Sequence, residues 1–146
     1  QFSLPPLLLH ALLAGNARYL NQWAASLGEP APGCTYLNFT ASHDGVGVRP
    51  LRGIVPDSEI QWLIEQIRSR GGLVSSKRNV DGSESPYELN VSYFDALSDR
   101  GKVDFDHQVD RFMCSQAIAL AMQGVPGIYF NSLTATALLE EVESAR

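Results

Sequence analysis

The sequence predicts an α/β fold in which parallel strands alternate with helices. Two apolar segments of strand length, Tyr36–Ala41 and Val125–Phe130, lie between longer segments with the apolar spacing of helices. Tyr36–Ala41 shows little polar alternation, as expected when both faces of a parallel strand are covered. Strands that alternate with helices along a chain are typical of right-handed parallel units.

The N-terminal segment Pro6–Leu27 predicts one helix that leads toward the first strand. The pair Pro5-Pro6 suits a first helical turn, where a missing N–H group costs nothing, and leucines follow at helical spacing. Glu29–Gly33 contains two prolines and a glycine, and therefore predicts a loop before the strand. A second loop, Gly45–Pro56, is expected after the strand.

A second helix is expected to begin at Asp57 or Ser58. Ser58 and Gln61 have the spacing of a capping box, in which side chains bind free backbone N–H groups of the first turn. The pair Gly71-Gly72 is expected to end this helix. Its apolar stripe consists of four residues, namely Ile60, Leu63, Ile64 and Ile67.

The remaining sequence predicts a turn-rich segment, a long helix and a weaker one. Leu73–Pro86 is expected to form a long surface loop or a short hairpin with its tip at Asn79–Gly82. Tyr87–Leu97 is expected to form one or two irregular helical turns. The strongest helical pattern covers Phe105–Met122, and Ala135–Arg146 predicts a weak acidic helix after the second strand.

Composition excludes several classes of partner. The 146 residues carry a formal net charge of -5 and a pI of about 5.1, and the acidic balance argues against nucleic acid as a partner. The apolar run Leu4–Leu13 is too short to span a bilayer, so no membrane partner is expected. Cys34 and Cys114 form neither a disulfide framework nor a zinc motif. We expect them to be reduced, mostly buried thiols, which fits a cytoplasmic protein.

The most informative motif is His43-Asp44, which directly follows the first strand. Polar groups at the C-terminal end of a parallel strand are how an α/β barrel displays its catalytic residues. Gly45 and Gly47 then let a ligand approach the backbone closely. The alternative for Asp44 is a purely structural role, in which its carboxylate shapes an Asx-turn before Gly45.

Together with Gly124-Val-Pro-Gly-Ile-Tyr-Phe130 about eighty residues later, His43-Asp-Gly-x-Gly47 resembles the α-amylase superfamily (glycoside hydrolase family thirteen), and within it the branch around sucrose phosphorylase. The resemblance implies a TIM (β/α)8 barrel, of which 1–146 is a single C-terminal segment: roughly strands seven and eight with flanking helices. A complete barrel takes roughly 250 residues or more. A helix-rich fragment with open strand edges is expected to rearrange or to form a homodimer in isolation.

The resemblance also implies roles for the motif residues. Asp44 would be a transition-state stabiliser that accepts hydrogen bonds from the 2- and 3-hydroxyls of the distorted sugar, and His43 would donate a hydrogen bond to the glucosyl unit. The nucleophile and the acid/base of a retaining enzyme lie about 5 Å apart. In this family both precede the position that Gln1 matches, so the chain alone is expected to be inactive. His10 and His107 lack such a context and are expected to be structural or surface residues.

A second block, Ser85–Asp95, resembles the loop that shapes the acceptor subsite of sucrose phosphorylase-type enzymes. Tyr87 and Glu88 match the positions in the family where a Tyr and its neighbour contact the acceptor or phosphate. Sucrose-specific members usually carry Gln where Glu88 stands. The pattern Tyr87-Glu-Leu-Asn90 is more similar to that of relatives that act on glucosylglycerate or sucrose 6-phosphate. The alternative is a loop whose Pro86 and Tyr87 only pack against the domain.

Four basic residues lie near these loops, namely Arg49, Arg52, Lys77 and Arg78. A phosphorylase must hold phosphate near the anomeric carbon, and the forked guanidinium of Arg suits that task. Arg49 and Arg52 are therefore candidate substrate-binding residues, although surface cations often have no role beyond solvation.

The expected function is that of a part of a retaining α-glucoside phosphorylase of the sucrose phosphorylase type. The intact enzyme would transfer glucose from a small α-glucoside to phosphate through a glucosyl-enzyme intermediate. The resemblance implies no metal and no organic cofactor. Two alternatives stay open at this point. One is an α-glucosidase or transglucosidase of the same superfamily, and the other is a non-catalytic module that binds sugar or a partner protein.

Overall fold

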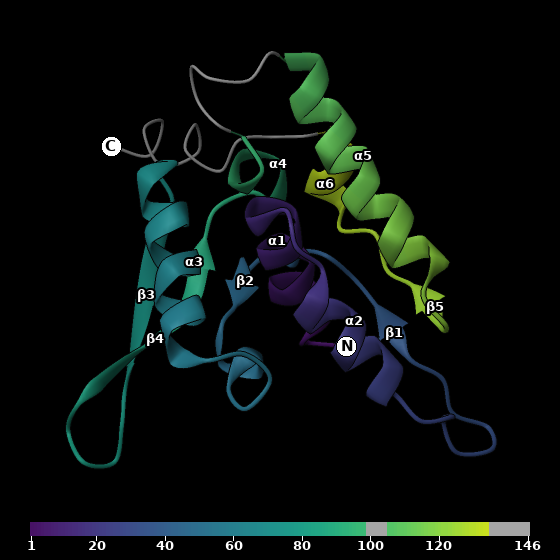
Figure 1. Ribbon diagram of the computed structural model, residues 1–146, viewed down its shortest axis with the longest axis horizontal. Helices are drawn as coiled ribbons and strands as arrows, with labels where there is room; N and C mark the ends of the chain where they lie inside the picture. The colour runs from purple at the N-terminus through teal and green to yellow at the C-terminus, as the bar shows by residue number, and fades with distance from the viewer. Residues whose placement is uncertain (99–104, 135–146) are drawn as a thin grey trace.

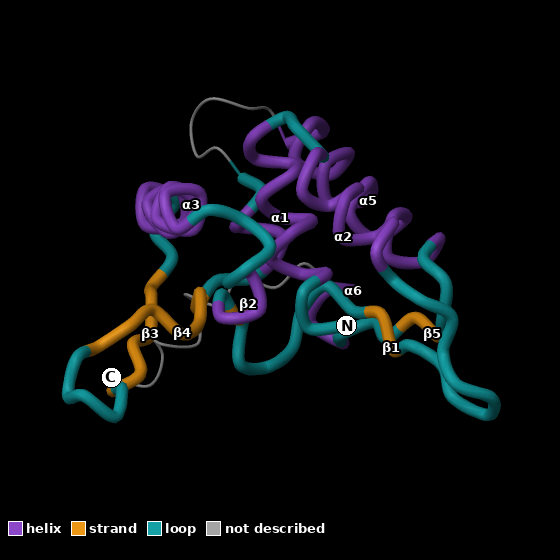
Figure 2. Tube along the Cα trace, turned by 60° about the horizontal axis from the view of Figure 1, so that its bottom comes forward, coloured by secondary structure: helices purple, strands orange, loops and turns teal. Residues whose placement is uncertain are grey.

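The first helix lies between two small sheets in the computed structural model, which describes residues 1–98 and 105–134 (Figure 1). The first sheet pairs β1 (Leu37–Asn38) with β5 (Val125–Pro126) in parallel. The second sheet is antiparallel with the order β2-β4-β3, formed by Val46–Gly47, Glu84–Asn90 and Leu73–Arg78 respectively. In Figure 2, β3 and β4 lie toward one end of the molecule and β1 and β5 toward the other, with β2 nearer the middle.

The predicted helix over Pro6–Leu27 is in fact two helices, α1 (Leu4–Ala14) and α2 (Arg18–Ser26). Gly15 adopts a left-handed φ of 63° and ends α1. The side chain of Asn16 then accepts a hydrogen bond from the backbone N–H of Arg18 at 2.9 Å, which shapes the turn into α2. The sequence pattern missed this break because apolar residues continue at helical spacing across it.

Helix α1 is apolar on nearly every side, which is typical of a helix that is covered all round. Leu4, Leu7, Leu8 and Leu9 are fully buried in the core. His10 is 3% exposed, and its Nε2 lies 2.8 Å from Oε2 of Glu59 on α3. Its ring meets Tyr19 and Trp62 edge to face. His10 is therefore a structural residue, as expected.

Helix α3 (Asp57–Ser69) buries the predicted stripe of four apolar residues against the core. The predicted capping box is wrong, because the helix begins at Asp57 after Pro56 and no side chain caps it. Asp57 and Glu59 lie in the first turn, where carboxylates interact favourably with the helix dipole. A short 3-10 helix, η1 (Arg49–Leu51), precedes it.

Of the two alternatives for Leu73–Pro86, the hairpin is confirmed, and it is longer than expected. β4 continues to Asn90, so the helical turns predicted for Tyr87–Leu97 are wrong over their first half. Only α4 (Tyr93–Ala96) is helical, and Oγ of Ser92 caps it by accepting the Asp95 N–H at 3.0 Å. β4 is the middle strand of its sheet, and its pairing with the distant β2 overrides the local preference.

Helix α4 is tied to the start of α1 by a buried hydrogen bond. The hydroxyl of Tyr93 donates to the carbonyl oxygen of Pro5 at 2.9 Å, and full burial raises the pKa of this phenol. Residues 88 positions apart are thereby joined inside the core.

The two parallel strands β1 and β5 are shorter than the predicted Tyr36–Ala41 and Val125–Phe130. Each pairs with the other alone among the described residues, and Phe130 already begins the short helix α6 (Phe130–Thr134). Gly124 lets β5 approach β1, since a Cβ there would lie 2.5 Å from the carbonyl oxygen of Tyr36.

The long helix α5 (Phe105–Ala121) agrees with its prediction to within one residue. Its C-terminal end is fixed by buried Asn38, whose Nδ2 donates to the carbonyl oxygens of Met122 and Gln123 at 3.3 and 3.0 Å. The helix predicted over Ala135–Arg146 lies outside the described residues. In residues 1–98 and 105–134 we find no helix that combines the length and apolarity needed to cross a membrane.

The prediction that both cysteines are mostly buried is wrong. Cys34 and Cys114 are free and exposed. Cys34 lies in the loop before β1, and Cys114 lies on the outer side of α5, where the helical pattern alone does not distinguish a covered face from an open one.

We predict that Gly45→Ala destabilises the chain by roughly 3 kcal/mol or more, since it combines backbone strain with a steric collision. Gly45 has a φ of 93°, and a Cβ there would collide with the carbonyl oxygen of Leu89. Gly53→Ala is the matched control, because Gly53 has a φ of 79° but open space around it. It should cost only about 1–2 kcal/mol. Urea denaturation checks both values, and equal costs would contradict the role given to the Leu89 contact.

Candidate functional site

His43 and Asp44 occupy the middle of a four-residue turn that leads from the β1 segment into β2. Gly45 N–H donates to the Ser42 carbonyl oxygen at 3.2 Å, and Asp44 N–H donates to Ser42 Oγ at 3.3 Å. The turn leaves the side chains of His43 and Asp44 81% and 60% exposed, with His43 Nε2 lying 3.2 Å from Asp44 Oδ1. Within the described residues the Asp44 carboxylate accepts no backbone hydrogen bond, so it does not form the Asx-turn of the structural alternative.

Gly45 has a role beyond the one expected from the sequence. Its missing side chain makes room for the Leu89 carbonyl of β4, and both Gly45 and Gly47 line a pocket next to the turn. The approach sets the register of β2 against β4, in which Val46 faces Leu89 and Gly47 faces Glu88. The turn that carries Asp44 is therefore fixed next to Glu88, although 44 positions separate them in the sequence.

A β-bulge in the hairpin determines how Tyr87 and Glu88 point. Ser75 pairs with Glu88 and Ser76 pairs with Pro86, so Tyr87 is an extra residue on β4. Successive residues of a regular strand point to opposite faces, and a bulge interrupts that alternation. Tyr87 and Glu88 accordingly line the same pocket. The Tyr87 carbonyl also accepts the Val48 N–H at 3.0 Å, which connects the bulge to the segment after β2.

This pocket has a volume of about 410 Å³ and brings together four of the predicted site residues, namely Asp44, Arg49, Tyr87 and Glu88. Its apolar side is formed by Phe2, Pro5, Phe39 and Pro50. Phe2 and Phe39 stack edge to face with their ring centroids 5.4 Å apart. Sequence reasoning missed both, because neither stands in a motif and they meet only once the chain has folded.

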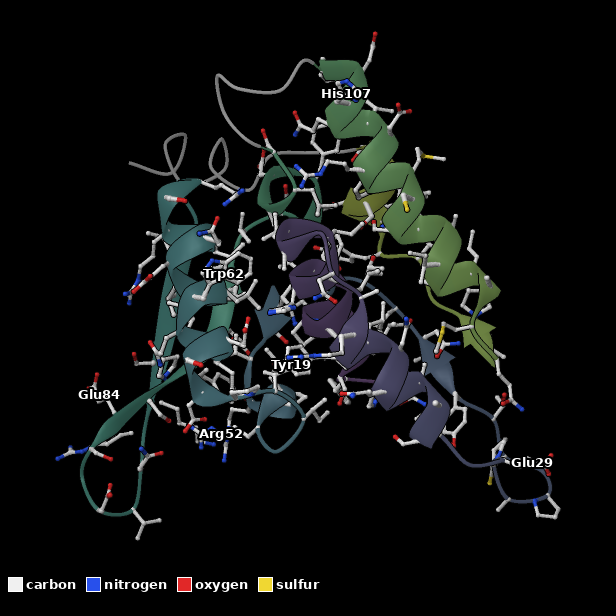
Figure 3. All side chains as sticks on the ribbon, viewed as in Figure 1. Tyr19, Glu29, Arg52, Trp62, Glu84 and His107 are labelled. Atoms are coloured by element: carbon white, nitrogen blue, oxygen red, sulfur yellow. The ribbon has the colours of Figure 1, made fainter. Side chains whose placement is uncertain are left out.

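The structure separates Arg52 from the other candidates. Arg52 lines a second pocket of about 430 Å³, together with Asp57, Gln61 and Glu84. Figure 3 shows Arg52 below the start of α3 and Glu84 on the hairpin. His43 contacts Asp44 but does not line the pocket that Asp44 shares with Glu88. The roles given to these residues stay predictions.

The charges of the pocket act on one another. The pKa of half-buried Glu88 is raised, first by burial and then by the negative charge of Asp44, while His43 acts in the opposite direction. The Tyr87 ring, which lines the same pocket, lies within reach of two cations. Arg49 Cζ is 6.0 Å and Lys77 Nζ is 5.4 Å from the ring centroid. The pocket therefore combines two carboxylates with two nearby cations.

Such a pocket suits a polyhydroxylated ligand that carries an anionic group. Carboxylates accept hydrogen bonds from sugar hydroxyls, and Arg binds phosphate or carboxylate through its forked guanidinium. In the described part of the chain, no group of three or more His, Cys, Asp or Glu side chains is arranged to hold a metal ion.

We predict that Asp44→Asn lowers the pKa of Glu88 toward its ordinary value, because the substitution removes a nearby negative charge. His43→Gln should raise the pKa of Glu88 further, because it removes a nearby positive charge. The direction of the Glu88 pKa shift also determines its effect on stability. A carboxyl with a raised pKa favours the folded state at low pH, and that contribution is lost as the pH rises through its folded pKa. Carbon-13 NMR titration of the Glu88 carboxyl measures both shifts. Shifts of the same sign in the two variants would contradict the arrangement.

The chain is similar to bacterial phosphorylases over most of its length. It is 50% identical to glucosylglycerate phosphorylase from Escherichia coli (strain K12) over 133 residues, which make up 91% of this chain and 24% of that protein. It is 32% identical to sucrose phosphorylase from Agrobacterium vitis, covering 90% of this chain and 26% of that protein. The chain thus spans about a quarter of the length of these curated relatives. No family model matches it.

A solved structure has the same fold over nearly the whole chain. The crystal structure of sucrose 6F-phosphate phosphorylase from Thermoanaerobacter thermosaccharolyticum matches with a TM-score of 0.78 at 22% sequence identity, covering 99% of this chain and 28% of that one. Mixed helix and sheet of this kind is consistent with part of a barrel. The resemblance drawn from the His43-Asp-Gly motif is therefore confirmed: the chain is homologous to a segment of the glucosylglycerate and sucrose phosphorylases, within that branch of the α-amylase superfamily.

Proposed function

We propose that the chain is part of a retaining α-glucoside phosphorylase, which transfers a glucosyl group from a small α-glucoside to inorganic phosphate. The observation that carries this proposal is the position of the Asp44 carboxylate. It is solvent-exposed and shares one pocket with Tyr87 and Glu88, the residues that match the acceptor loop of the family. Similarity to phosphorylases over about nine tenths of the chain supports the same conclusion.

We further propose that β1 and β5 are strands seven and eight of a TIM barrel, with 1–146 as one segment of it. The parallel pairing of β1 with β5 and the helices between them support this assignment. Consecutive strands of such a barrel are parallel neighbours, and each is followed by a helix. In this arrangement the Asp44 turn follows strand seven, at the face where barrel enzymes place their active sites.

In the proposed reaction, Asp44 acts on the glucosyl unit. A glucosyl-enzyme intermediate forms through a transition state with oxocarbenium character, and hydrogen bonds to the ring hydroxyls tighten as that charge develops. Asp44 would accept such bonds, and His43, which lies beside it, would donate one to the same sugar. The nucleophile and the acid/base are assigned to the parent enzyme outside this chain, so the chain alone is proposed to be inactive.

The acceptor is proposed to be a small hydroxy acid such as glycerate. Three glucosylglycerate phosphorylases are 50%, 46% and 44% identical to this chain, whereas three sucrose phosphorylases are 32%, 28% and 26% identical. Glu88, which replaces the Gln of sucrose-specific relatives, would accept hydrogen bonds from the acceptor hydroxyls. Arg49 would bind its anionic group or phosphate, whereas Arg52 lies in the other pocket and is not included.

The two alternatives from the sequence are not favoured. Each relative compared is a phosphorylase, which does not favour a hydrolase or transglucosidase, and no observation points to a non-catalytic binding module. We also propose a cytoplasmic location. Two exposed free thiols, Cys34 and Cys114, support it, since such thiols persist in a reducing compartment.

The proposed function predicts that the full-length parent releases glucose 1-phosphate from glucosylglycerate in the presence of phosphate. Asp44→Asn should reduce kcat/KM for phosphorolysis by well over tenfold, because a neutral amide stabilises a cationic transition state less than a carboxylate does. Tenfold corresponds to about 1.4 kcal/mol of barrier. Gln61→Ala, on the exposed surface of α3, is a control away from the Asp44 pocket. Free glucose as the main product, or a loss below tenfold for Asp44→Asn, would refute the proposal.

For the isolated chain we predict a dimer. Leu37 and Val125 are paired on β1 and β5, yet they are 55% and 52% exposed, and exposed apolar strands promote association. The double substitution of Leu37→Thr and Val125→Thr places β-branched strand formers at both positions and removes apolar surface, so it should shift the chain toward monomer. Light scattering at high concentration measures both species. A clean monomer for the unsubstituted chain would count against the prediction.

A further inference from the structure

The geometry of the hairpin places Lys77 next to Tyr87, a candidate residue of the acceptor subsite. It pairs with Ser85 across the β3–β4 ladder, which makes Tyr87 its diagonal neighbour on the adjacent strand. Its Nζ lies 5.4 Å from the centroid of the Tyr87 ring, within the range of a cation–π interaction. A long, flexible lysine side chain is thereby directed to one ring at the edge of the pocket.

Arg49 approaches the same ring from a different part of the chain. It belongs to η1, lines the pocket, and has its Cζ 6.0 Å from the Tyr87 centroid. Two like charges that converge on one aromatic ring repel each other, and an anion between or beside them would relieve that repulsion. Within the described residues neither cation forms an ion pair, so both charges are available to a ligand.

The distribution of charge specifies what the ligand carries. Asp44 and Glu88 line the pocket and suit hydroxyl groups, while Arg49 and the Lys77 side chain place positive charge near the Tyr87 ring. A ligand that carries both hydroxyl groups and a carboxylate or phosphate matches the carboxylates and the cations. A neutral polyol of the same size would match the carboxylates only.

We propose that Lys77 is a specificity-determining residue, which acts with Arg49 beside the Tyr87 ring to favour anionic acceptors over neutral ones. The proposal rests on the function proposed above. It adds a residue that does not line the pocket wall and that the family motif does not mark. Its ammonium group contributes charge, and the Tyr87 ring positions that charge.

The test compares Lys77→Gln with the unsubstituted full-length enzyme by calorimetric titration with glycerate, inorganic phosphate and glycerol. The substitution should raise the Kd of at least one anion about tenfold and leave the Kd of glycerol within about twofold, since tenfold is the scale of one well-placed charge contact (roughly 1.4 kcal/mol). Lys77→Arg should restore anion binding, because it restores the positive charge. In kinetics, the KM for glycerate in the synthetic direction should rise while kcat changes less.

Arg78→Gln is the matched control. Arg78 is the next residue on β3, is exposed, and lines neither pocket, so the same loss of charge there should leave all three affinities unchanged. Equal weakening of glycerate and glycerol, no weakening by Lys77→Gln, or no binding of either anion to the unsubstituted enzyme would overturn the proposal. Because the titrations need no turnover, they decide the role of Lys77 even if the enzyme releases no glucose 1-phosphate. A failure to release glucose 1-phosphate would count against the proposed function alone.

Discussion

The turn that carries His43 and Asp44 depends on a close contact between strands that are distant in the sequence. β2 can lie against β4 because Gly45 has no side chain where the Leu89 carbonyl oxygen approaches it. From this contact follows the register that sets Gly47 opposite Glu88. The bulge at Tyr87 then directs two neighbouring side chains into the pocket that Asp44 also lines. Without the contact, Asp44 and the pair Tyr87 and Glu88 would lie on separate elements with no fixed distance between them.

The buried helix α1 provides the second constraint. It lies between the two sheets and packs against α2, α5 and β2 (Figure 1). Its leucines fix its depth, and two polar contacts fix its orientation. Pro5 accepts the buried Tyr93 hydroxyl at one end, and His10 meets Glu59 further along the helix. A buried hydrogen bond adds to the apolar packing, because a buried polar group that loses its partner costs about 1–3 kcal/mol. The position of α1, whose Pro5 lines the pocket, is therefore specified by polar as well as apolar groups.

The sequence predicted the features that depend on local patterns and missed those that depend on distant partners. The stripe of α3 and the extent of α5 follow from helical periodicity, and the His43-Asp44 motif lies at a turn as its residues suggest. The extension of β4 was missed because its pairing with β2 is decided by residues some forty positions away. The bulge was missed for the same reason, since it is defined only by the register of the two strands.

The candidate site was predicted in part. Asp44, Arg49, Tyr87 and Glu88 meet in one pocket, whereas Arg52, only three residues after Arg49, lies in another. The 3-10 turn at η1 explains the difference, because it rotates the chain between the two arginines. The aromatic pair at the pocket wall joins residue 2 to residue 39, and no local signal indicates such a contact.

Because of the bulge at Tyr87, the tip of the hairpin tolerates insertions and deletions better than the part next to the pocket does. Ladder pairing continues on both sides of the bulge, and β2 holds the far side of β4, so residues gained or lost at the tip beyond Arg78 and Glu84 would leave Tyr87 and Glu88 in place. Loss of Tyr87, the extra residue of the bulge, would restore regular alternation and remove one of the two side chains from the pocket. Insertions and deletions at the tip of the hairpin are therefore compatible with this site. Next to the pocket, only substitutions that keep the chain length are compatible with it.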